Sequence, residues 1–133
     1  MNYLKTYEDY KSMNVVGEHL YIKFDLLDKK HKAKVDSGAE TCSIHSTYQK
    51  VKDGVLTCKL LDNDEILEFK TFKKKNVKSS NGESSSRYFI KLKCTVEDTD
   101  YNIEFSLNDR NDMEYPILIG KNLLRKDFLI DIK

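Results

Sequence analysis

Apolar and polar residues alternate along several segments of the chain. In segment 20–26, apolar side chains occupy every second position, with Tyr21, Lys23 and Asp25 between them. Segments 88–96 and 101–107 repeat the pattern. Successive side chains of a β-strand point to opposite faces, so each segment is predicted to be a half-buried strand.

Shorter apolar runs predict further strands at 55–61, 66–72, 116–119 and 128–132. The last two alternate poorly, as strands covered on both faces do. A helix is predicted only over about 121–126, directly after Gly120. Many short strands and one short helix indicate a small, nearly all-β domain.

A serine-rich stretch, 79–86, separates two of the predicted strands and contains Asn81-Gly82, a common dipeptide of hairpin turns. A disordered linker is the alternative, but linkers are rare inside compact domains, so a mobile hairpin tip is preferred. We therefore expect an N-terminal extension at 1–14 and a single domain at 15–133, with a hairpin at about 79–87.

Charge and composition exclude some classes of protein. The 133 residues include 23 Lys and Arg and 22 Asp and Glu, a net charge of +1, which argues against a general nucleic-acid binder. No apolar run approaches the roughly 18 residues of a membrane span, and the first residues lack an apolar signal core. Three irregularly spaced cysteines cannot form a complete disulfide framework. A cytoplasmic protein with reduced thiols and no membrane partner is expected.

One basic run interrupts the even balance of charge. It consists of Lys70, Lys73, Lys74, Lys75 and Lys78. Such runs usually form a solvated face. The alternative is a surface that attracts an acidic substrate or a nucleic acid.

The segment with the clearest chemical potential is Asp36-Ser37-Gly38, which follows an apolar-flanked strand. Its glycine allows a sharp turn and close approach of another chain. Its hydroxyl can lock the loop by a hydrogen bond to nearby backbone. Alone the triplet is a weak signal, because the same residue types form ordinary turns.

A second segment strengthens the catalytic interpretation. Residues 116–119 form an apolar strand that ends in Gly120 and leads directly into the predicted helix. This arrangement resembles the C-terminal part of retropepsins, in which such a strand threads beside the catalytic loop. The Asn81-Gly82 turn lies between the two segments, where a retropepsin places the flap over its substrate.

The resemblance extends to a bacterial retropepsin-like family often labelled ATP-dependent zinc proteases, whose members commonly occur beside ATP-grasp amino-acid ligases. It rests on segments 32–45, 77–83 and 107–121 and runs from about Val15 to the C-terminus. It implies an acid-protease barrel with one short C-terminal helix. The site residues that it implies are Asp36 as the catalytic group, Ser37, Gly38 and Ala39 in its loop, Ser80, Asn81, Gly82 and Glu83 in the flap, and Arg87 and Arg110 as candidate substrate contacts. Pairing of these arginines with acids such as Asp109 or Glu114 is the alternative.

This sequence departs from the family pattern at Ser37, where threonine is usual, and at Lys121, where arginine is usual. In retropepsins that arginine pairs with an acid equivalent to Glu40. Lysine cannot make the bidentate contact, so we expect a weaker structural pair between Glu40 and Lys121.

Counting carboxylates predicts the assembly. An aspartic peptidase needs two carboxylates that share one proton. This chain carries a single Asp-Ser/Thr-Gly triplet, so the second aspartate must come from another copy in a homodimer. The predicted function is cofactor-free hydrolysis of a peptide or protein, and the family's neighbouring ligases suggest an acidic substrate. The alternative is a retropepsin-fold module that binds an extended peptide without hydrolysing it.

The zinc label is not matched by a set of ligands. Cys42 and His45 supply two candidates, His19 and His31 are isolated, and no His-Glu-x-x-His motif occurs. Zinc sites need three or four ligands. We therefore predict no metal site and expect Cys42 and His45 to pack beside the active-site loop.

Overall fold

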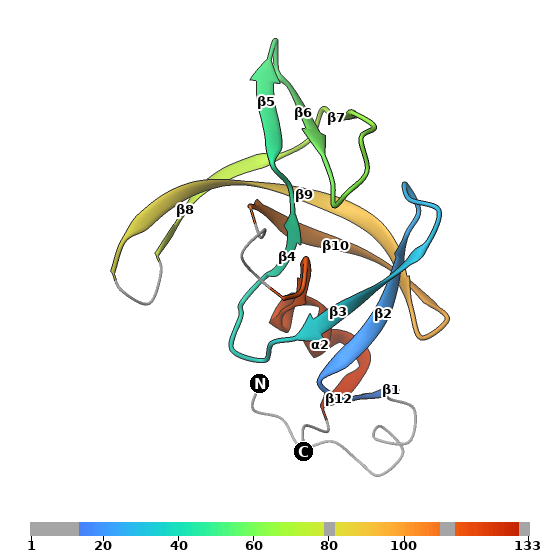
Figure 1. Ribbon diagram of the computed structural model, residues 1–133. Helices are drawn as coiled ribbons and strands as arrows, with labels where there is room; N and C mark the ends of the chain where they lie inside the picture. The colour runs from blue at the N-terminus through green and yellow to red at the C-terminus, as the bar shows by residue number, and fades with distance from the viewer. Residues whose placement is uncertain (1–13, 79–81, 110–113, 131–133) are drawn as a thin grey trace.

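The computed structural model describes residues 14–78, 82–109 and 114–130. Within these ranges the chain is built mainly of strands, and its one helix is short (Figure 1). The elements are β1 (Asn14–Val16), β2 (His19–Phe24), β3 (Lys30–Val35), β4 (Cys42–His45), β5 (Tyr48–Lys52), β6 (Val55–Lys59), β7 (Leu67–Phe69), β8 (Lys73–Lys78), β9 (Ser84–Val96), β10 (Thr99–Asn108), β11 (Ile117–Ile119), α2 (Lys121–Asp127) and β12 (Phe128–Ile130).

Six strands close into a barrel. They pair in the order β10-β4-β11-β3-β2-β9, and an antiparallel ladder between β9 and β10 closes the ring. Closure leaves no unpaired edge within the ring. The architecture confirms the predicted all-β barrel of the retropepsin-like type with one short C-terminal helix.

Three features extend beyond the barrel. Strand β8 pairs with the outer part of β9 and forms a long hairpin. Strands β5, β6 and β7 form a separate antiparallel sheet, and β5 and β6 project from the barrel in Figure 1. Strands β1 and β12 pair in parallel. Strand β1 begins at Asn14, one residue before the expected domain boundary.

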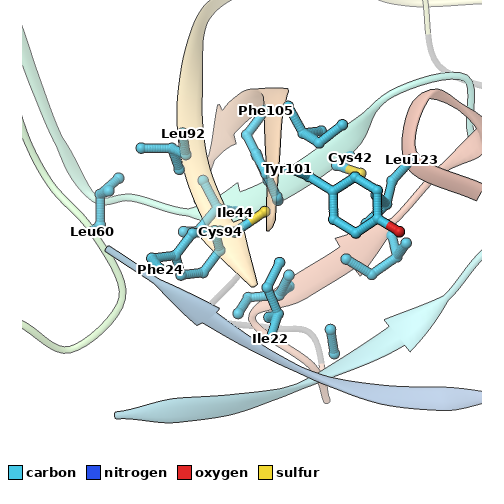
Figure 2. Packing of buried hydrophobic residues seen from close by; sticks show 14 of the residues in the cluster. Ile22, Phe24, Cys42, Ile44, Leu60, Leu92, Cys94, Tyr101, Phe105 and Leu123 are labelled. Carbon is cyan, nitrogen blue, oxygen red and sulfur yellow. The ribbon is translucent and has the colours of Figure 1, made fainter. Parts of the chain in front are cut away.

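The barrel interior is filled by the side chains that the alternating pattern predicted to be buried. Leu20, Ile22 and Phe24 of β2 are buried, whereas Tyr21, between Leu20 and Ile22, is 58% exposed. Figure 2 shows this cluster, in which the ring of Phe24 meets the edge of Phe105 from β10 at 5.3 Å between centroids. Burying one such side chain contributes about 1.5–3 kcal/mol, so this packing is a main source of stability.

Some predicted boundaries were wrong. The expected strand at 55–61 ends at Lys59, and Leu61 adopts a φ of 58°, outside the strand region. The expected strand at 66–72 is strand only over Leu67–Phe69. Strands β4 and β5 were not predicted: β4 is buried at all four positions and β5 is largely exposed, so neither alternates in a simple way.

The hairpin predicted at about 79–87 spans the connection from β8 to the start of β9. Strands β8 and β9 are antiparallel, and the last register pair is Lys78 with Ser84. Gly82 has a φ of 87°, a left-handed conformation that glycine adopts without steric cost. Ser80 and Asn81 lie outside the described residues. Among the described helical residues, none forms a segment long and apolar enough to cross a membrane.

Candidate active site

The loop that carries Asp36 joins β3 to β4 and is fixed to the rest of the barrel by backbone hydrogen bonds. The amide of Asp36 donates to the carbonyl of Ile119 in β11 at 2.9 Å. The carbonyl of Ala39 accepts from the amide of Lys121 at 2.8 Å, and that of Glu40 accepts from Asn122 at 3.2 Å. Strand β11 and the start of α2 therefore fix both halves of the loop.

The carboxylate of Asp36 is held by its own loop. The side-chain Oδ1 accepts a hydrogen bond of 3.0 Å from the amide of Gly38. The main-chain carbonyl of Asp36 accepts one of 3.1 Å from the amide of Ala39. Asp36 is half-exposed, and Ser37 and Gly38 are exposed. The group is thus oriented, solvent-accessible and able to act in proton transfer.

Within the chain, backbone segments approach most closely at Gly120, not at Gly38. A Cβ on Gly120 would lie 2.7 Å from the carbonyl carbon of Thr41 and 2.8 Å from the carbonyl oxygen of Ala39. A Cβ on Gly38 would meet only Asp36 Oδ1, at an ordinary 3.4 Å. Gly120 is therefore the residue that lets β11 and α2 pass directly beneath the Asp36 loop.

Glu40 joins the loop to α2 through two cations. Lys121 Nζ lies 3.1 Å from Glu40 Oε1, and an Arg125 guanidinium nitrogen lies 4.0 Å from Oε2. The hydrogen bond and charge of Lys121, followed by the charge of Arg125, lower the pKa of Glu40 below its usual 4.5. Arg125 was missed from sequence, although its i,i+4 spacing from Lys121 places both on one helix face. It supplies a second contact that Lys121 alone cannot make.

Asn122 is a second residue that sequence reasoning missed. Its Oδ1 accepts from the amide of Cys42 at 2.8 Å, and its Nδ2 donates to the carbonyl of Glu104 at 2.8 Å. One side-chain amide thereby satisfies a donor of β4 and an acceptor of β10. The only sequence signal was an amide side chain in the first turn of the predicted helix.

The expectation that Cys42 and His45 both pack beside the Asp36 loop was half wrong. Cys42 does so: its buried Sγ accepts a hydrogen bond of 3.3 Å from the amide of Gly120. His45 lies at the other end of β4, about 10 Å away at 3.3 Å per residue. There it lines a cavity of about 310 Å³ together with His31 and Pro116.

Strand alternation also turns Cys42 and His45 to opposite faces of β4. Within the part of the chain that the structure describes, no group of three or more His, Cys, Asp and Glu side chains gathers closely enough to hold a metal ion. The residues present thus do not fit a zinc centre. Burial raises the pKa of Cys42 to about 12, so its thiol stays protonated.

Three of the remaining predicted residues lie on the β8–β9 hairpin. Gly82 and Glu83 are exposed at its turn. Arg87 is half-exposed and pairs in register with Lys75. Arg110 lies outside the described residues, as do Ser80 and Asn81. The hairpin leaves the same barrel that holds the Asp36 loop (Figure 1).

Comparison with known proteins gives a family match over most of the chain. Residues 15–133 match the family described as "RimB-like: Retropepsin-like aspartic endopeptidase RimB". This agrees with the resemblance drawn from the sequence motifs.

Curated relatives are longer proteins with a ligase name. A "Probable alpha-L-glutamate ligase" of Shewanella pealeana is 32% identical over 110 residues, which cover 75% of this chain and 24% of that protein. A protein of the same name from Desulfotalea psychrophila is 27% identical over the same shares. The chain thus spans about a quarter of the length of these relatives.

Among solved structures, a protein of unknown function from Legionella pneumophila superposes with a TM-score of 0.59. It is 19% identical, and the match covers 90% of this chain and 93% of that one. At this identity the likeness concerns the fold alone.

Proposed function

Since this chain belongs to the RimB-like family of retropepsin-like aspartic endopeptidases, we propose that it hydrolyses peptide bonds as a homodimer with one catalytic Asp36 from each subunit. The observation that carries the proposal is the oriented, half-exposed Asp36 carboxylate on a loop fixed to β11. The sequence contains a single Asp-Ser-Gly triplet, so one chain supplies half of a catalytic pair.

The chemistry follows from placing two such carboxylates a few Å apart. Like charges at that distance cannot both ionise, so the pair holds one proton. The ionised carboxylate takes a proton from water, whose oxygen attacks the scissile carbonyl carbon, while the protonated carboxylate donates to the carbonyl oxygen. Collapse of the tetrahedral intermediate breaks the C–N bond. The carboxyl that took a proton from water donates it to the departing nitrogen, and the other carboxylate takes back a proton from a hydroxyl of the intermediate, which restores the pair. The Gly38 amide on Oδ1 orients the carboxylate of each subunit.

The two-stranded sheet of β1 and β12 supports dimerisation. It lies outside the barrel ladder, and each strand pairs only with the other among the described residues. Two-stranded sheets are marginally stable in water. Pairing with the same sheet of a second copy would stabilise both and create a two-fold interface.

We further propose that the substrate is an acidic, glutamate-rich peptide segment. The relatives bear the name of a ligase that acts on glutamate. Strand β8, the first strand of the proposed flap, contains Lys73, Lys74 and Lys75 in succession. Cationic groups beside the substrate path would attract carboxylates over roughly a Debye length, about 10 Å at 0.1 M salt.

One observation favours a second candidate function, a peptide-binding module without hydrolysis. Among the described strands, β8 pairs with β9 alone and therefore stands at the open edge of its sheet. An extended peptide could add to this edge by main-chain hydrogen bonds and be gripped without being cut. The two functions differ in whether Asp36 is required.

The decisive variant is Asp36→Asn. An amide cannot share the proton that the mechanism needs. We expect turnover of a glutamate-rich peptide to be lost, while circular dichroism and the dimer seen by sedimentation stay unchanged. Turnover equal to that of the wild type would refute the catalytic proposal. Peptide binding by both proteins without cleavage by either would favour the binding module.

Removing metal ions provides an independent test of the mechanism. Because carboxylates activate the water, we expect hydrolysis to survive prolonged treatment with a strong chelator. Loss of activity that is restored by zinc, and not by magnesium, would replace the proposed mechanism by a metal-dependent one.

A further inference from the structure

The lysines of β8 are divided between two faces of the hairpin. In the antiparallel ladder, Lys74 is directly opposite Tyr88, whereas Lys73 is opposite Phe89 and Lys75 is opposite Arg87. Directly opposed residues of a ladder share a face, and neighbours along a strand alternate. Lys74 therefore lies on one face with Tyr88, and Lys73 and Lys75 lie on the other.

The face of Lys73 and Lys75 is tied to the barrel by one acid. Lys75 Nζ lies 3.0 Å from Glu104 Oε1, and Lys73 Nζ lies 3.7 Å from Oε2. The Glu104 side chain is only 20% exposed, so screening by water is incomplete. Lys75 also lies 4.5 Å from the centroid of the Phe89 ring. Both ammonium groups are therefore held against β10 as structural contacts.

The face of Lys74 is the continuation of the barrel interior. Along β9, Tyr88 has the same parity as the buried Ile90 and Leu92. Figure 1 shows the hairpin curving with its concave side toward β4 and the loop that precedes it, where Asp36 lies. Lys74 thus faces the side of the hairpin on which the proposed catalytic group is found.

Lys74 is held over an aromatic ring on this face. Its Nζ lies 5.5 Å from the centroid of Tyr88, whose own ring meets the edge of Phe72 at 5.9 Å. Among the described residues, the ion pairs within 4 Å that involve β8 are those of Lys73 and Lys75 with Glu104. A ring positions an ammonium group by cation–π attraction and leaves its outer side open to a carboxylate.

We propose that Lys74 is the specificity-determining residue of the hairpin, where it binds a carboxylate side chain of the substrate, and that Lys73 and Lys75 anchor the hairpin through Glu104. This inference rests on the proposed function and assigns recognition of the substrate carboxylate to one residue of the basic run. It also separates a direct contact from general attraction, because the three adjacent lysines contribute almost equally to the distant field.

The test compares Lys74→Met with the matched control Lys73→Met, which removes the same charge one position away. Each full-length variant is assayed on a glutamate-rich peptide and on the same peptide with glutamine at every glutamate. The readout is the ratio of kcat/KM values for the two peptides. A charge-assisted hydrogen bond is roughly twice as strong as one between neutral groups. We therefore expect Lys74→Met to reduce the ratio by on the order of tenfold and Lys74→Arg to retain most of it.

We expect Lys73→Met to change the ratio by less than about twofold, because distant attraction alone is weak at moderate salt. Equal reductions in Lys73→Met and Lys74→Met would overturn the assignment and leave only long-range attraction. If the wild type cleaves neither peptide, the proposed function fails instead. Fluorescence anisotropy with the labelled glutamate peptide then tests the role of Lys74 independently of cleavage. Weaker binding only in Lys74→Met supports that role, and equal binding by all proteins overturns it.

Discussion

The amide of Cys42 donates a hydrogen bond of 2.8 Å to the side-chain oxygen of Asn122, although the two residues are 80 positions apart in the chain. Cys42 begins β4 directly after the Asp36 loop, and Asn122 belongs to the first turn of α2. The contact therefore ties the exit of the candidate catalytic loop to the only helix among the described residues.

Replacing Asn122 by alanine is expected to destabilise the fold. The change leaves the Cys42 amide and the Glu104 carbonyl without their partner. An unsatisfied buried polar group costs about 1–3 kcal/mol. Urea denaturation should show this loss, whereas Asn63→Ala, at an exposed asparagine that accepts from Glu65, should cost less than about 1 kcal/mol. Equal costs would contradict the bridging role of Asn122.

Gly120→Ala should be more damaging than Gly38→Ala. The new methyl group at 120 would lie within 2.8 Å of backbone atoms of residues 39 and 41, which cannot move without displacing the Asp36 loop. Overpacking of this kind costs roughly 1–3 kcal/mol or more. At residue 38 the methyl group meets only an ordinary contact at 3.4 Å. Thermal unfolding of the two variants provides the comparison, and a smaller shift for Gly120→Ala would contradict the crowding.

Lys121→Arg should strengthen the contact with Glu40. A guanidinium can engage both carboxylate oxygens, which an ammonium cannot do. The pKa of Glu40, already lowered by Lys121 and Arg125, should fall further, while Lys126→Arg on the same helix should leave it unchanged. The contribution of this pair to stability is present above about pH 4.5 and is lost as the pH falls through the lowered pKa. Carboxyl NMR titration measures the shift, and a rise in this pKa would contradict the expectation.

Alkaline pH should destabilise the fold through its thiols. Burial raises the pKa of Cys42 and Cys94 to about 12 and that of Cys58 to about 11. Above pH 9 the unfolded chain releases these protons and the folded chain retains them, so stability decreases as the pH rises toward 11. The thiols should also react with a disulfide reagent only after unfolding. Rapid labelling of the native protein at pH 8 would contradict their burial.

The sequence predicted well those strands in which apolar and polar residues alternate and a single face is buried. The alternating segments became β2, β9 and β10 because each has one face in the barrel interior. Strand β4 could not be recognised in this way, since it is buried at all four positions, including Ser43 and His45. Strand β8 was interpreted only as a basic run, because its pairing with β9 is a contact between segments and leaves no local periodicity.

For the candidate site, residues adjacent in the chain were easier to identify than residues joined by folding. The Asp36 loop and the Glu40–Lys121 pair followed from motifs in the sequence. Arg125, Asn122 and Glu104 act through long-range contacts, which a single sequence does not reveal. The position of His45 was misjudged because spacing along the chain does not indicate which end of a strand a residue occupies.

The open edge of β8 also affects how the protein behaves at high concentration. Unpaired edge strands can join edge to edge with another molecule and begin aggregation. Pairing of β8 with the same strand of a second copy would bring its lysines close to one another, and like charges across a ladder are unfavourable. The lysines of this edge should therefore oppose edge-to-edge pairing of β8 with a second molecule. This repulsion should weaken when salt screens their charge.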